Sequence, residues 1–221
     1  MNENETNKLV KGALLLMLAG LISKVLSAGY RVPLQNLTGD IGFYIYQQVY
    51  PILGIAMMLA LYGFPSAVSK MTVELKAAGK SLSLHSFYIP VFLLLLALNG
   101  AIFLFLFWNA DSIAGLVGDV QLTYTYRLAA FAFLLVPFSA LLRGVYQGTY
   151  EMKPSAYSQV IEQLVRITCV AFFVNLLLPY GIEYAAAGAM ISVIIGEFIS
   201  LMYMIYTFKR KKTLRLRHRF F

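Results

Sequence analysis

The chain has 221 residues, of which 60% are hydrophobic and only 13% are Asp, Glu, Lys or Arg, and its formal net charge is +8. Soluble domains carry about 25% charged residues, so this composition and a mean hydropathy of +0.72 exclude a polar surface large enough to keep the chain in water. The composition therefore predicts a multi-pass membrane protein, and the single cysteine, Cys169, excludes an intrachain disulfide.

Six apolar segments follow in chain order, each long enough to cross the hydrocarbon core of a bilayer as a helix of about 20 residues. Helices are expected because backbone groups in lipid must be satisfied within the segment, and because these runs lack the polar–apolar alternation of barrel strands. The helices are placed near residues 10–33, 43–68, 85–108, 121–146, 154–178 and 185–208. The sequence thus predicts an all-α transmembrane domain over residues 1–208.

The basic residues between these segments predict the orientation in the membrane. Lys8 and Lys11 precede the first segment, Lys recurs in the second and fourth connections, and seven Lys or Arg lie within residues 209–221. The first, third and fifth connections contain acidic residues and no Lys or Arg. By the positive-inside rule both termini are cytoplasmic. A cleaved signal peptide at the first segment is disfavoured, because its loss would break this alternation.

Residues 209–221 form the end of the sequence and are strongly basic. They are expected to be a cytoplasmic tail, or a truncated link to a further lobe, that contacts anionic lipid headgroups. A short basic tail on a membrane protein does not indicate a nucleic-acid partner.

Several ionisable or amide side chains lie within the predicted helices, where they usually face a bundle interior or a watery cavity. The first helix carries Lys24 and Arg31 on one face, the second carries Gln47, and the fourth carries Arg127 near its outer end. Arg143, near the cytoplasmic end of the fourth helix, is expected to snorkel to the membrane surface.

The fifth helix carries a polar stripe at its cytoplasmic half. Gln159, Glu162, Gln163 and Arg166 follow the spacing i, i+3, i+4, i+7, which places them on one helical face. This stripe predicts the wall of a cavity that opens to the cytoplasm. The alternative is an i,i+4 pair between Glu162 and Arg166 that allows both charges to be buried without any ligand.

The sixth helix combines a lone acid with a packing pattern. Gly188, Ser192, Gly196 and Ser200 recur every four residues, a spacing that lets helix backbones approach closely. Glu197 lies on the same helix and, with Glu162, is a candidate ligand for a coupling ion. No nucleotide-binding loop, catalytic triad or cluster of metal ligands is visible, so neither an enzyme nor a cofactor is indicated.

Three stretches carry a resemblance to a known family. Residues 11–34, 42–70 and 141–167 read KGALLLMLAGLISKVLSAGYRVPL, GFYIYQQVYPILGIAMMLALYGFPSAVSK and LLRGVYQGTYEMKPSAYSQVIEQLVRI. They resemble the polysaccharide-biosynthesis export family typified by stage V sporulation protein B, which is related to the lipid II flippases and multidrug extruders. The resemblance covers essentially the whole chain and implies one six-helix lobe of a two-lobe exporter, with a second lobe as a partner.

The resemblance also implies an activity, which is the movement of undecaprenyl-diphosphate-linked saccharides across the bacterial cytoplasmic membrane by alternating access. The residues expected to line the substrate cavity are Lys24, Arg31, Gln47, Arg127, Gln159, Glu162, Gln163 and Arg166. Related flippases carry cavity arginines on their first two helices, whereas the second helix here offers only Gln47 and Gln48. Two alternatives stay open: a cation-coupled drug extruder of the same fold, and a non-transporting membrane fragment or scaffold.

Overall fold

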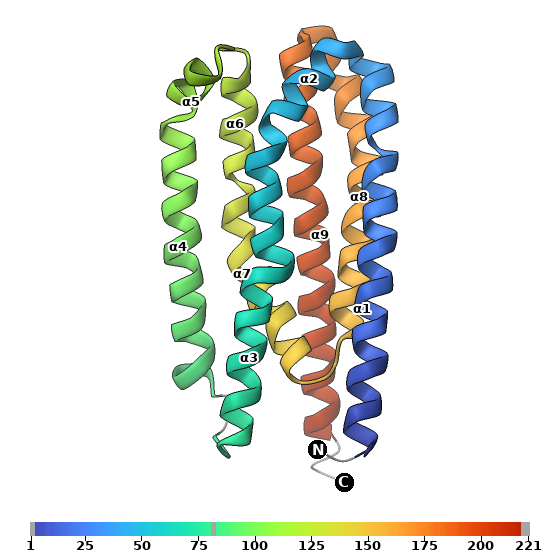
Figure 1. Ribbon diagram of the computed structural model, residues 1–221, viewed down its shortest axis with the longest axis vertical. Helices are drawn as coiled ribbons and strands as arrows, with labels where there is room; N and C mark the ends of the chain where they lie inside the picture. The colour runs from blue at the N-terminus through green and yellow to red at the C-terminus, as the bar shows by residue number, and fades with distance from the viewer. Residues whose placement is uncertain (1–2, 81–82, 218–221) are drawn as a thin grey trace.

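The computed structural model describes residues 3–80 and 83–217, which are helical almost throughout and contain no strand. The helices run nearly parallel to one long axis and form an elongated bundle (Figure 1). In chain order the first half comprises α1 (Glu3–Gly29), α2 (Arg31–Met58), the π-helix η1 (Leu59–Gly63), α3 (Phe64–Ala77), the π-helix η2 (Leu84–Tyr88) and α4 (Ile89–Trp108). The second half comprises α5 (Ala110–Val117), α6 (Leu122–Ala130), α7 (Ala132–Gly148), α8 (Lys153–Leu177), the 3-10 helix η3 (Leu178–Tyr180) and α9 (Ile182–Arg217).

The first predicted connection is mostly helical rather than a loop. The chain remains helical through residues 34–42 and breaks only at Gly39, where φ is 65° and ψ is −171°. Glycine adopts this conformation readily because it has no Cβ. In Figure 1 the chain crosses the top of the bundle here, so the later part of α2 descends beside the rest of the bundle while α1 ascends.

Two predicted helices are interrupted at positions that the hydropathy pattern does not mark. The second predicted helix contains the π-helix η1 just before Pro65, which lies in the first turn of α3. The fourth is divided into α6 and α7 at Phe131. Proline lacks an N–H donor and blocks regular α-helical bonding toward the preceding turn, which accounts for the local change at η1.

Five segments of the described chain are long and apolar enough to cross a membrane. They are Leu9–Ala56, His85–Trp108, Leu122–Gly148, Lys153–Tyr180 and Ile182–Arg210. The first is 48 residues long and contains the break at Gly39, so it includes the first predicted helix and much of the second. Six separate crossings therefore stay a prediction, whereas the all-helical, multi-pass character is confirmed.

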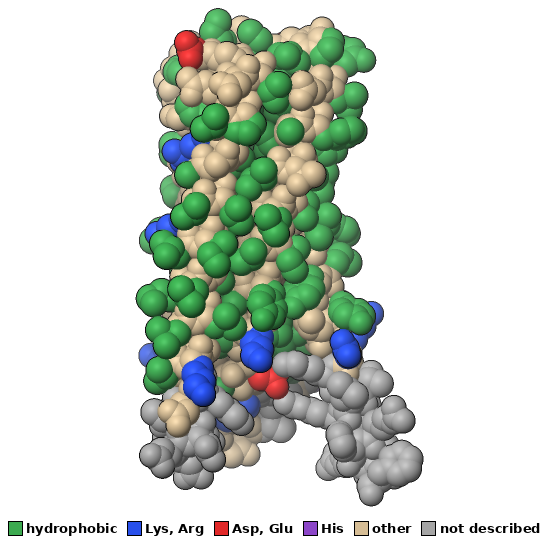
Figure 2. Space-filling model, turned by 90° about the vertical axis from the view of Figure 1, so that its right-hand side faces the viewer, with side chains coloured by type: hydrophobic (Ala, Val, Ile, Leu, Met, Phe, Trp, Pro, Cys, Tyr) green, Lys and Arg blue, Asp and Glu red, His purple; other side chains and the backbone are tan. Residues whose placement is uncertain are grey.

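The surface fits a lipid environment. Hydrophobic side chains cover most of the face shown in Figure 2, and Lys and Arg gather mainly toward its lower end. Large apolar side chains that would be buried in a soluble protein are exposed here, including Met17, Val25 and Trp108 at 63%, 67% and 72%. Such a continuous apolar exterior is expected where hydrocarbon, not water, is the solvent.

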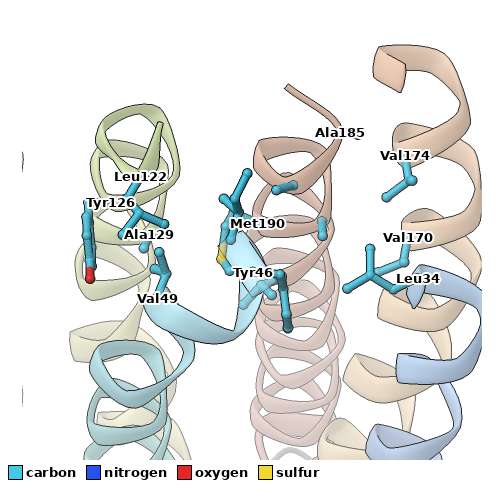
Figure 3. Close-up of a cluster of buried hydrophobic side chains, with 14 of the residues drawn as sticks. Leu34, Tyr46, Val49, Leu122, Tyr126, Ala129, Val170, Val174, Ala185 and Met190 are labelled. Atoms are coloured by element: carbon cyan, nitrogen blue, oxygen red, sulfur yellow. The ribbon is translucent and has the colours of Figure 1, made fainter. Parts of the chain in front are cut away.

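Close helix packing forms the interior. Figure 3 shows one buried cluster in which Tyr46 and Val49 of α2, Tyr126 of α6, Val170 of α8 and Met190 of α9 converge. Between α8 and α9 the predicted small-residue pattern is confirmed. A Cβ on Gly188 would lie 2.9 Å from the carbonyl oxygen of Phe173, and one on Gly196 would lie 2.8 Å from that of Glu162. These glycines bring the backbone of α9 against α8 and so position the polar stripe.

Candidate functional site

The polar stripe of α8 faces the interior of the bundle. Gln159, Glu162, Gln163 and Arg166 are 5%, 0%, 6% and 4% exposed. The periodicity therefore identified the buried face of this helix correctly. Buried polar groups require partners or a hydrated space, because an unpaired one costs several kcal/mol in an apolar surrounding.

A cavity of 260 Å³ lies between this stripe and the α1 and α2 helices. Ser23, Lys24 and Ser27 of α1 and Tyr50 of α2 contribute to its polar lining, together with the stripe of α8. A second cavity of 560 Å³ shares Lys24, Gln159 and Tyr62 with the first and continues toward Gln147 of α7. A cavity therefore adjoins the α8 stripe, and Lys24 from α1 meets the stripe in it; its opening to the cytoplasm stays a prediction.

Glu162 is the centre of a buried charge cluster. Its Oε1 accepts a hydrogen bond from Nη2 of Arg166 at 2.9 Å, and its Oε2 accepts one from Nη2 of Arg143 at 3.1 Å. The same Nη2 of Arg143 lies 3.6 Å from Oε2 of Glu197 and donates to Oγ of Ser200 at 3.2 Å. The cluster joins α7, α8 and α9. The predicted i,i+4 pair is thus present, but as part of a larger network.

The expectation that Arg143 snorkels to the membrane surface is wrong. Its side chain is completely buried and contacts two carboxylates from neighbouring helices. Glu162 and Glu197 together carry two negative charges, and Arg166 alone offsets one of them. The sequence shows Arg143 as one of several basic residues within the predicted helices, but the rotation of α7 that points it toward these carboxylates could not be deduced from the local pattern.

The cluster balances its charge internally, with two guanidiniums facing two carboxylates. Lys24 differs from these residues, because its side chain is exposed to the cavity and no described carboxylate lies within ion-pair distance of it. Since arginine remains protonated in proteins, the balance leaves Lys24 as the charge that the cavity presents to a ligand.

The other predicted site residues lie farther from this point. Arg31 is exposed, and its guanidinium carbon lies 5.3 Å from the ring centroid of Tyr50, a cavity-lining residue. Arg127 donates a hydrogen bond to Asp111 at 2.6 Å and, like the exposed Gln47, lines neither of the two cavities. The structure therefore brings Lys24 and the α8 stripe together, with Arg31 beside them, and leaves Arg127 and Gln47 outside.

A tyrosine cluster adjoins the cavity and was not predicted as part of the site. The hydroxyl groups of Tyr30 and Tyr46 are 2.6 Å apart in the interior, and the rings of Tyr46 and Tyr50 are 6.1 Å apart. The repeated tyrosines of residues 44–50 are apparent in the sequence, but aromatic residues are common throughout this chain. Tyr50 lines the cavity, and Tyr46 links it to the buried pair of hydroxyl groups.

The fold and this site define an all-helical, multi-pass membrane protein with a polar, partly charged cavity between its helices. Residues 9–221 match the family described as polysaccharide biosynthesis protein. The chain belongs to that family, as the resemblance predicted.

Individual relatives from Bacillus subtilis (strain 168) agree with this assignment. The chain is 43% identical over 206 residues to the uncharacterized membrane protein YabM, which covers 91% of this chain and 38% of that protein. It is 36% identical over 216 residues to stage V sporulation protein B, with 96% and 41% covered. It is 32% identical over 225 aligned residues to the lipid II flippase MurJ, with 95% and 41% covered.

The chain spans about two fifths of the length of these relatives. No solved structure matches it.

Proposed function

We propose that this chain is one six-helix lobe of a two-lobe exporter that moves undecaprenyl-diphosphate-linked saccharides across the bacterial cytoplasmic membrane by alternating access. Membership of the polysaccharide biosynthesis family and similarity to a protein named lipid II flippase support this proposal. A second lobe would supply the opposite wall of the translocation path. Membrane transporters of this general kind place their substrate site between repeated halves near the midplane.

The proposed topology has six crossings with both termini in the cytoplasm. The crossings are α1, the end of α2 with α3, α4, α6 with α7, α8, and α9. The alternation of basic and acidic connections supports this arrangement. The beginning of α1 and the end of α9 also lie at the same end of the bundle (Figure 1). The basic residues 209–221 would contact anionic lipids there, although the side chains from residue 211 onward lie outside the described ones.

Lys24 is the main structural support for the proposed activity. It has no described carboxylate partner, and it faces a cavity whose other charges balance each other. An ammonium acts as a point charge for phosphate, while a guanidinium can hold two phosphate oxygens at once. Lys24 and Arg166 would therefore bind the diphosphate. Gln159, Gln163 and the nearby hydroxyl groups would donate to the remaining oxygens of the headgroup.

The more distant residues take smaller parts in this proposal. Arg31, on the ring of Tyr50, adds positive potential at one side of the cavity. Arg127 is engaged by Asp111 and is assigned no substrate contact. Glu162 and Glu197 both contact Arg143, which occupies the position that a coupling cation would need. For this reason we favour a lipid flippase over a cation-coupled drug extruder of the same fold.

Transport in proteoliposomes that contain both lobes of the exporter tests the proposal. Movement of a fluorescent undecaprenyl-diphosphate disaccharide is followed by quenching of the label in the outer leaflet. Replacing Lys24 with Ala is expected to slow movement by about tenfold or more, since a hydrogen bond to a charged group contributes about 1.5–3 kcal/mol. Lys24→Arg should retain activity, and Lys70→Ala, at an exposed lysine on α3, serves as the control. Equal rates for Lys24→Ala and wild type would rule out the assigned site.

A further inference from the structure

Arg143 and Glu197 line neither of the two cavities, yet they are connected to the 260 Å³ cavity. Glu162 makes the connection, because it lines the 260 Å³ cavity and also accepts the hydrogen bond from Arg143 at 3.1 Å. Glu197 contacts the same Nη2 atom of Arg143 as Glu162 does, with its Oε2 at 3.6 Å. These two residues therefore act on the cavity only through another side chain or through their charge.

The charges around Glu162 determine how Arg143 and Glu197 affect the charge of the cavity. One oxygen of the carboxylate contacts Arg166 at the cavity, and the other contacts Arg143 behind it. Because the charge of Glu197 offsets that of Arg143, the charge of Glu162 stays available to offset Arg166. The cavity then has the single positive charge of Lys24. Burial makes this balance consequential, since charges at 0–4% exposure are screened far less than surface charges.

We propose that Arg143 and Glu197 are positioning residues that set the electrostatic potential of the cavity, and thereby its preference for an anionic headgroup, without touching the ligand. The identity of that ligand as a diphosphate lipid rests on the proposed function, whereas the effect on the cavity potential does not. Removing the negative charge of Glu197 makes the cavity more positive, because a guanidinium cannot lose its proton to compensate.

A cysteine placed in the cavity can measure this potential directly. Ser27 lines the cavity on α1, so Ser27→Cys in a Cys169→Ser background supplies a single reporter thiol. Its rates of modification by an anionic and a cationic methanethiosulfonate reagent are measured on the full chain in nanodiscs of phosphatidylcholine. A change in access alters both rates alike. A change in potential alters their ratio, because the two reagents carry opposite charges.

Glu197→Gln is expected to raise the anion-to-cation rate ratio by roughly tenfold, as a unit charge about 10 Å away in an effective dielectric between about 20 and 80 would do. Adding Arg143→Gln removes the surplus positive charge and should restore the wild-type ratio. Adding Arg143→Lys keeps the charge and should leave the ratio raised. A role in packing alone would not distinguish Gln from Lys in this way. Ser112→Cys, exposed on α5, is the control site and should show no change.

An unchanged ratio in folded Glu197→Gln protein would overturn the inference, as would equal ratios for the Gln and Lys replacements of Arg143. If the double variants do not fold, the single Glu197→Gln ratio decides, because only a change of charge raises it. The result is separate from the proposed function. A raised ratio, together with no transport of lipid-linked saccharide by the exporter assembled with both lobes, would support the electrostatic role and refute the flippase assignment.

Discussion

Glu162 provides a strong test of the buried charge cluster, because its carboxylate contacts two guanidiniums that are almost fully buried. Glu162→Ala removes that carboxylate and leaves both positive charges in the interior. Breaking a buried ion pair from one side costs about 3–5 kcal/mol. For a chain of this size 1 kcal/mol lowers the melting temperature by about 2–4 °C, so we expect a decrease of roughly 6–20 °C.

The chain contains a matched control for this measurement. Lys70 and Glu74 form another i,i+4 pair, with 78% and 64% of their side chains exposed and 3.8 Å between the charged atoms. Exposed pairs contribute about 0–1 kcal/mol, so Glu74→Ala should lower the melting temperature by no more than about 4 °C. Thermal unfolding of both variants in the same detergent is compared with wild type. If the two substitutions shift the melting temperature equally, the buried cluster stabilises the bundle no more than an exposed ion pair does.

Three further predictions concern packing, the surface and the cavity. Gly196→Ala places a Cβ 2.8 Å from the carbonyl oxygen of Glu162 and should destabilise the fold by about 1–3 kcal/mol. In Gly100→Ala the added Cβ meets nothing within 4 Å, so this variant should be more stable by up to about 1 kcal/mol. Melting temperatures that shift in the same direction in both variants would contradict this. Asp111→Asn breaks an ion pair with Arg127 that is short, at 2.6 Å, but exposed, so it should lower the free energy of unfolding by less than about 1 kcal/mol, and by less in high salt. A large loss of stability that does not depend on salt would show that this ion pair is not exposed to solvent. Gly20 lines both cavities, and a Cβ built on it would lie 3.7 Å from the Tyr62 hydroxyl. Gly20→Leu should therefore slow modification of Ser27→Cys by both charged reagents and leave the ratio of the two rates unchanged. Unaffected rates would indicate another entrance to the cavity.

The sequence predicted the features that depend on local periodicity. The spacing of the α8 stripe identified its buried face, and the four-residue repeat of small residues identified the α9 surface that meets α8. Both patterns follow from 3.6 residues per turn and the need to bury small or polar groups away from lipid. The family resemblance, carried by three stretches of the chain, was also confirmed.

The relations between distant helices were not predictable in the same way. Arg143 lies 19 residues before Glu162 and 57 before Ser200, and only the rotation of α7 brings it to both. The same reason explains why Arg127, predicted in the cavity, instead contacts Asp111. The helical path through residues 34–42 also differed, because apolar composition does not reveal that this connection stays helical except at one glycine with positive φ.

An equilibrium binding measurement shows whether the cavity binds an anionic lipid headgroup through Lys24. Farnesyl diphosphate and farnesol are titrated into the chain in phosphatidylcholine nanodiscs, since the two differ only in the diphosphate. We predict that wild type binds farnesyl diphosphate at least about tenfold more tightly than farnesol, as one charge-assisted hydrogen bond would provide. Lys24→Ala should abolish most of this difference. Equal affinity of wild type for the two lipids, or an undiminished preference in Lys24→Ala, would show that Lys24 does not bind the headgroup.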